Sequence, residues 1–107
     1  MPLPRILIVD DYPDALEVWG LYLRAAGFQV LLACDGPTAF EGIVREKPDV
    51  VVMDLELPGR SGFEVASAVK ARPDTRAIPL IAATGYSLAS QLDRARASGF
   101  DSVIVKP

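Results

Sequence analysis

The sequence predicts one α/β domain, a doubly wound five-stranded parallel sheet with helices on both faces. Short runs rich in β-branched residues alternate with longer segments of helical periodicity. This alternation is typical of parallel strands joined by right-handed helical crossovers. The chain has 107 residues, of which 50% are hydrophobic and 23% charged. Such a balance is ordinary for a single globular domain, so we expect residues 1–107 to form one domain.

The first half of the chain contains two predicted strands and two predicted helices. Residues 5–9 and 29–33 are short apolar runs and form the strands. Between them a helix begins near Pro13 and ends before Gly27, because proline favours the first turn of a helix and glycine its end. The apolar residues of this helix recur at three- and four-residue spacing and predict its buried stripe: Ala15, Val18, Trp19, Tyr22, Leu23 and Ala26. A second helix of about ten residues follows the turn at 35–38.

The second half continues the alternation. The run Val50-Val51-Val52-Met53 is typical of a strand buried on both faces. A helix is predicted from Gly62 to about Arg72, then a strand over 80–83, a helix over about 88–98 and a strand over 103–105. No further helix follows the fifth strand. We therefore expect either a piece of a longer protein or a sheet face that another chain covers.

Composition argues against several classes of function. The net charge is −3 and the pI is about 4.8, whereas nucleic acid and anionic membrane surfaces both need a basic face. The chain has no histidine, which leaves oxygen ligands for any metal. Its single cysteine, Cys34, has no intrachain disulfide partner, and we expect it to be a small buried residue at a strand end. There is no signal peptide and no apolar run of the ~18 residues that span a membrane, so we expect a cytoplasmic protein.

Polar side chains follow four of the five predicted strands. They are Asp10 and Asp11 after the first, Asp54 after the third, Thr84 after the fourth and Lys106 after the fifth. Because the carboxyl ends of parallel strands lie at one edge of the sheet, these side chains should converge. Three carboxylates within about 5 Å would repel by roughly 3 kcal/mol per pair at an effective dielectric of about 20. A cation must share such a site, and oxygen-only ligands suit Mg²⁺ or Mn²⁺.

This set of groups fits phosphoryl transfer to an aspartate. Such a reaction depends on positioning and charge neutralisation more than on covalent activation. Asp54 is the predicted nucleophile. The metal and Lys106 would neutralise the phosphoryl oxygens, and the Thr84 hydroxyl would donate to one of them.

Four motifs in chain order resemble the receiver domain of two-component response regulators. They are Ile8-Val9-Asp10-Asp11, Met53-Asp54-Leu55-Glu56-Leu57-Pro58 with Gly62, Ala83-Thr84-Gly85, and Val105-Lys106-Pro107. The resemblance implies a flavodoxin-like strand order 2-1-3-4-5 and the transfer of a phosphoryl group from a histidine kinase or phosphotransfer protein to Asp54. It implies Mg²⁺ held by Asp10, Asp11, Asp54 and the backbone carbonyl of Glu56. It also implies Thr84 as the switch hydroxyl, a cis peptide between Lys106 and Pro107, and a homodimer or an effector domain as a further partner.

Some positions depart from the pattern of that family. Receivers usually carry Tyr or Phe three residues before the lysine, where this chain has Val103. Gly85 follows the threonine and should loosen the loop. Glu56 and Tyr86 occupy positions that flank the path of the hydrolysing water in this family. We hypothesise that they slow autodephosphorylation, and loss of the phosphoryl group within seconds would refute this.

Three other functions are alternatives to a phosphorylated receiver. A haloacid-dehalogenase-like phosphatase also uses an aspartate nucleophile, but the second acid of its motif is usually Asp and here it is Glu56. A flavodoxin-like cofactor binder needs a phosphate loop after the first strand, where residues 10–14 carry three acids that would repel phosphate without a metal. A receiver that serves only as an unphosphorylated docking module is the remaining alternative.

Overall fold

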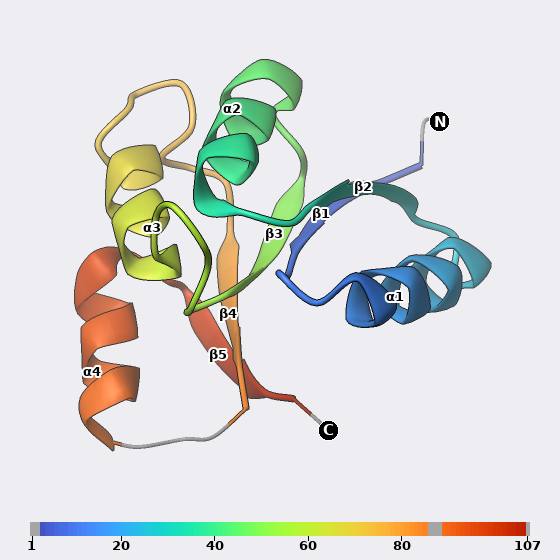
Figure 1. The fold of residues 1–107 in the computed structure, drawn as a ribbon. Coiled ribbons are helices and arrows are strands. Elements are labelled where there is room, and N and C mark those ends of the chain that lie inside the picture. The colour runs from blue at the N-terminus through green and yellow to red at the C-terminus, as the bar shows by residue number, and fades with distance from the viewer. Residues whose placement is uncertain (1–2, 86–88, 107) are drawn as a thin grey trace.

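The computed structural model describes residues 3–85 and 89–106, in which five strands alternate with four helices (Figure 1). In chain order the elements are β1 (Arg5–Val9), α1 (Pro13–Ala25), β2 (Gln29–Ala33), α2 (Gly36–Glu46), β3 (Val50–Asp54), α3 (Gly62–Lys70), β4 (Leu80–Thr84), α4 (Ala89–Ser98) and β5 (Ser102–Val105). The predicted alternation of strands and helices is confirmed. None of these helices is long and apolar enough to cross a membrane.

The strands form one parallel sheet in the order β2-β1-β3-β4-β5, which confirms the predicted flavodoxin-like topology. The register aligns the carboxyl ends of the strands. Val9 lies opposite both Ala33 and Met53, and Thr84 lies opposite Val105. The residues that follow β1, β3, β4 and β5 therefore meet at one edge of the sheet.

Helices cover both faces of the sheet, but unequally. In Figure 1, α2, α3 and α4 lie on one side and α1 lies on the other. Successive residues of a strand point to opposite faces, so Leu7 and Val9 pack in the layer with α2, α3 and α4, while Ile6 and Ile8 pack against α1. The hydrophobic core between the sheet and α2, α3 and α4 is the larger of the two.

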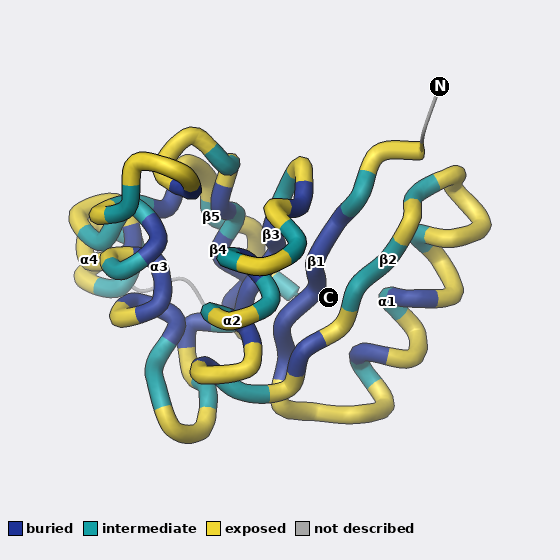
Figure 2. The backbone as a smooth tube through the Cα atoms, turned by 90° about the horizontal axis from the view of Figure 1, so that it is seen from above, coloured by how far each residue is buried: buried dark blue, intermediate teal, exposed yellow. Residues whose placement is uncertain are grey.

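The predicted buried stripe of α1 is only partly right. Trp19 and Leu23 of that stripe are partly buried against the core, whereas Val18 and Tyr22 are 66% and 73% exposed. The buried residues of α1 are Leu16 and Gly20, which the predicted stripe did not include. The helix contacts the sheet over β1 and β2, and its flank that carries Val18 and Tyr22 projects past them. Figure 2 shows α1 exposed along most of its length. On the same face of the sheet Ile104, which lies opposite Ala83, is 39% exposed.

Two smaller expectations are also wrong. Helix α3 ends at Lys70 rather than near Arg72, because Pro73 disfavours helical backbone at the residue before it and the hydroxyl of buried Thr75 donates to the carbonyl of Val69 instead. Cys34 is exposed. The strand alternation gives the buried position to Ala33 and turns the next residue outward.

A charged cluster fastens α3 to the edge of the sheet opposite the candidate site. The Lys70 ammonium donates to the carbonyl oxygens of Arg76 and Ile78 and to the Asp101 carboxylate. Asp101 also accepts from the backbone N–H of Leu80 at 2.8 Å. Burial alone would raise the pKa of Asp101, but the hydrogen bonds from Leu80 and Lys70 hold it below the ordinary value of 3.8. The cluster therefore stabilises the fold through an ionised Asp101.

Candidate functional site

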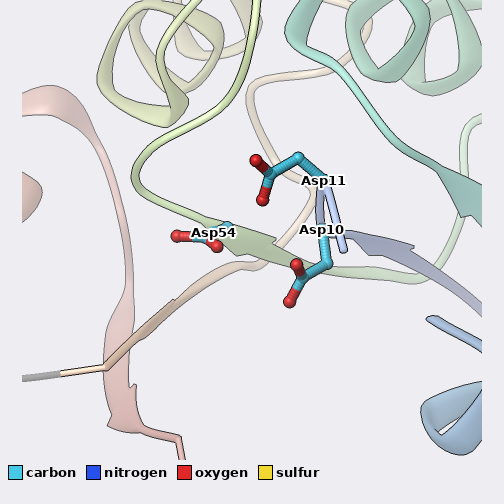
Figure 3. Close-up of side chains that lie close together, drawn as sticks. All are labelled: Asp10, Asp11 and Asp54. Carbon is cyan, nitrogen blue, oxygen red and sulfur yellow. The ribbon is translucent and has the colours of Figure 1, made fainter. Parts of the chain in front are cut away.

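Three carboxylates converge where β1 and β3 end. Asp10 and Asp11 follow β1, and Asp54 is the last residue of β3 (Figure 3). One oxygen from each lies within 4.8 Å of the others. Asp10 is 3% exposed and Asp11 is exposed, so the group reaches from the core to the surface. This is the acidic cluster that the sequence predicts.

Lys106 provides the cation of the site. Its ammonium donates to Oδ2 of Asp10 at 2.7 Å and to Oδ2 of Asp54 at 2.8 Å. Burial disfavours the charged amine, but the two hydrogen bonds and the two negative charges outweigh it and raise the pKa of Lys106 above 10.5. Lys106 is therefore a permanent cation between the buried acid and the predicted nucleophile.

The backbone fixes the orientation of both bridged acids. Oδ1 of Asp10 accepts from the N–H of Tyr12 at 3.0 Å, and Oδ1 of Asp54 accepts from the N–H of Glu56 at 3.1 Å. Each acid therefore presents one oxygen to its own loop and the other to Lys106. Glu56 is exposed, and its predicted role as a carbonyl ligand stays a prediction.

Glycine brings α3 close to the end of β3. The N–H of Gly62 donates to the carbonyl of Leu55 at 2.9 Å. A Cβ at this position would lie 2.9 Å from Cα of Leu55 and closer still to the carbonyl oxygen of Asp54. Glycine is thus required by space, which explains its place in the predicted motif.

Thr84 ends β4 and is 5% exposed. Its carbonyl accepts from the N–H of Lys106 at 2.7 Å, so the ladder between β4 and β5 holds the backbone of Lys106 beside it. Thr84 also lines the cavity described next. The structure therefore brings Asp10, Asp11, Asp54, Thr84 and Lys106 together, as the sequence predicts.

A cavity of about 280 Å³ opens over this edge of the sheet. Its lining consists of Asp11, Asp54, Leu55, Glu56, Thr84, Gly85, Gln91 and Lys106. Sequence reasoning missed Gln91. The available signal was its place near the start of the helix that follows β4, because such a helix begins at the carboxyl edge of the sheet.

A larger and mostly apolar hollow of about 420 Å³ lies beside the site, along α1. Asp10 and Lys106 line the end of this hollow that borders the site, and its apolar wall consists of Val18, Trp19 and Tyr22. Four of the polar groups predicted to carry the chemistry line the smaller cavity, namely Asp11, Asp54, Thr84 and Lys106, whereas Asp10 lines the larger hollow. The larger hollow places the single tryptophan of the chain next to the site.

Three further expectations from the sequence concern Val103, Tyr86 and the peptide bond between Lys106 and Pro107. Val103 is partly buried against the layer of α2, α3 and α4. Tyr86 lies outside the described residues, and so does the bond between Lys106 and Pro107.

Comparison with known proteins gives a consistent result. The family model of the response regulator receiver domain matches residues 6–107. The chain is 37% identical over 106 residues to the phosphate regulon transcriptional regulatory protein PhoB of Rhizobium meliloti, a match that covers 98% of this chain and 46% of that protein. Several curated response regulators are matched over only 23% to 46% of their own length.

Solved structures are similar over nearly the whole chain. A putative response regulator from Chloroflexus aurantiacus is 30% identical with a TM-score of 0.93, and the match covers 99% of this chain and 87% of that one. The receiver domain of the sensor histidine kinase PA1611 from Pseudomonas aeruginosa is 29% identical with a TM-score of 0.91 over the same shares. That structure has a magnesium ion coordinated in its active site cleft.

Proposed function

Because this chain belongs to the response regulator receiver domain family of two-component systems, we propose that it is a phosphoacceptor switch in which Asp54 accepts a phosphoryl group. One observation carries the proposal. The Asp54 carboxylate lines a cavity, accepts a hydrogen bond from Lys106 and lies within 4.8 Å of two further carboxylates. An acid in these surroundings can attack phosphorus while nearby charges stabilise the phosphoryl oxygens.

We propose Mg²⁺ or Mn²⁺ as the metal of the site. Three carboxylates with one ammonium leave negative charge uncompensated, and hard divalent cations prefer such oxygen donors. Asp10, Asp11, Asp54 and the backbone carbonyl of Glu56 would hold the ion. The magnesium in the similar PA1611 receiver domain supports this choice. A bound Mg²⁺ would neutralise charge on the incoming phosphoryl group.

The transfer follows from the positions of the side chains. A carboxylate oxygen of Asp54 attacks the phosphorus, an O–P bond forms, and the bond from phosphorus to the donor breaks. When the donor is phosphohistidine, the imidazole nitrogen leaves with the electron pair of the P–N bond and the Asp54 carboxylate becomes an aspartyl phosphate. Lys106 offers its N–H groups to phosphoryl oxygens as they replace the free carboxylate, and Thr84 donates its hydroxyl to another.

The partners follow from this chemistry. The donor would be a histidine kinase or a phosphotransfer protein, and the readout would come from an effector domain or a second receiver copy. We propose that residues 1–107 act as one receiver domain in the cytoplasm and that neither nucleic acid nor membrane is its direct partner. Thr84 would couple the phosphoryl group to the loop that follows β4, the connection through which the switch would spread.

Mass spectrometry after incubation with acetyl phosphate and Mg²⁺ tests the proposal. The expected product carries one phosphoryl group, and Asp54→Ala should carry none. The matched control is Asp93→Ala, which removes an exposed acid of α4 outside the cavity and should leave labelling unchanged. Labelling that survives Asp54→Ala would disprove the assignment of the acceptor. An unlabelled wild-type chain would favour the unphosphorylated docking module.

A further inference from the structure

We propose that Gln91 accelerates hydrolysis of the aspartyl phosphate by holding the attacking water. The inference rests on the proposed phosphorylation of Asp54 and concerns the reverse half of the switch, the return to the unmodified acid. It assigns a role in the chemistry to α4, which begins after the loop that follows β4.

The position of Gln91 allows this role. It is the third residue of α4, it is partly exposed, and it lines the same cavity as Asp54, Glu56 and Thr84. A group at the wall of the cavity can reach a water that approaches from solvent. It need not compete with the proposed metal ligands, whose carboxylates lie at the ends of β1 and β3.

The hydrogen-bonding capacities of the described lining residues single out Gln91. The attacking water must donate a hydrogen bond to a protein acceptor while it stays close to the phosphoryl oxygens. The carboxylates of Asp11 and Glu56 accept only and repel the phosphoryl group, and Lys106 donates only. The Thr84 hydroxyl is committed to a phosphoryl oxygen in the proposed switch. An amide both accepts and donates and carries no net charge, so among the described lining residues Gln91 is the side chain left that can bind water and phosphoryl oxygen at once.

The step balances without another reactant. The water oxygen attacks phosphorus on the side opposite the Asp54 oxygen, and a new O–P bond forms. The bond between phosphorus and the Asp54 oxygen breaks, and its electron pair returns to the carboxylate. The water proton leaves with inorganic phosphate or passes to solvent. In this step Oε1 of Gln91 accepts from the water and Nε2 donates to a phosphoryl oxygen, which supplies orientation rather than proton transfer.

Substitutions that separate chemistry from bulk test the inference. Wild type, Gln91→Met and Gln91→Ala are phosphorylated with acetyl phosphate and Mg²⁺ and freed of donor, and the remaining phosphoprotein is followed by mass spectrometry. Methionine keeps the size of the side chain without its donor or its strong acceptor. One net hydrogen bond corresponds to roughly three- to tenfold in rate, so both variants should lose phosphate about three- to tenfold more slowly.

The control is Gln29→Met, which makes the same chemical change at the amino end of β2, on the opposite edge of the sheet. It should lose phosphate at the wild-type rate. If Gln91 only shields the site, Ala will speed the loss and Met will leave it unchanged, and either result overturns the inference. Failure of the proposed function itself looks different, because then no variant and no wild-type chain acquires a phosphoryl group at Asp54.

Discussion

Gly62 couples the stability of the domain to the position of its phosphoacceptor. A Cβ at this residue would meet the backbone at the end of β3, at 2.9 Å from Cα of Leu55 and closer to the carbonyl oxygen of Asp54. Backbone atoms cannot rotate away as a flexible side chain can. We expect Gly62→Ala to lower the free energy of unfolding by about 1–3 kcal/mol, the usual cost of overpacking. Each kcal/mol corresponds to a fall in Tm of about 4–8 °C for a domain of this size.

The matched control is Gly42→Ala. Gly42 lies inside α2, and a Cβ there would meet no atom within 4 Å apart from its chain neighbours and the backbone of its own helix. Alanine should stabilise the helix by about 0.5–1 kcal/mol. Urea unfolding followed by circular dichroism should thus shift in opposite directions for the two variants. Because the clash displaces the backbone that carries Asp54, Gly62→Ala should also be phosphorylated more slowly. A Gly62→Ala protein at least as stable as wild type would refute the reasoning.

Three further substitutions test the charges. Asp11→Ala should weaken Mg²⁺ binding by at least about tenfold, because it removes a proposed ligand. A Mg²⁺ titration followed by the fluorescence of Trp19 would measure the affinity. Unchanged binding would exclude Asp11 from the metal site. Lys106→Met should instead strengthen Mg²⁺ binding several-fold in the same titration by removing a nearby like charge, and weaker binding would contradict the expected repulsion. Asp101→Asn should lower the urea midpoint at pH 7. The pKa of Asp101 in the folded state lies below 3.8, so the stability that its carboxylate contributes is present above that pH and is lost as the pH falls further. The difference in urea midpoint between the variant and wild type should therefore shrink below about pH 3.8. A difference that does not depend on pH would count against a role for the carboxylate.

The edge of the sheet that carries the candidate site could be predicted because its position follows from a general geometric rule. Once the alternation of strands and helices indicates a parallel sheet, every residue that follows a strand lies at one edge. Asp10, Asp54, Thr84 and Lys106 are scattered over almost the whole chain, yet no contact between them had to be guessed. The bridge from Lys106 to both acids follows from charge and proximity.

Details that depend on packing could not be predicted in this way. Periodicity identifies α1 as amphipathic, but contact with β1 and β2 buries only part of the apolar arc of the helix. The pattern therefore cannot tell buried Leu16 from exposed Tyr22. Gln91 carries no motif, and its place in the cavity depends on the start of α4 relative to β4. The contact between Arg94 and Phe63 could not be predicted either, because it depends on how α4 packs beside α3. The Arg94 guanidinium lies over the Phe63 ring, 4.0 Å from its centre.

The charges of the site also indicate an order of events. Lys106 pairs with Asp10 and Asp54 but not with Asp11, so the one positive charge of its ammonium against three carboxylates leaves two negative charges uncompensated. Every phosphodonor is itself an anion and would be repelled by that excess at short range. A divalent cation would cancel the excess, whereas two of the three N–H groups of the Lys106 ammonium already bind Asp10 and Asp54. Metal binding should therefore precede the donor, and the lysine should act later, when the Asp54 carboxylate that it now binds becomes an acyl phosphate.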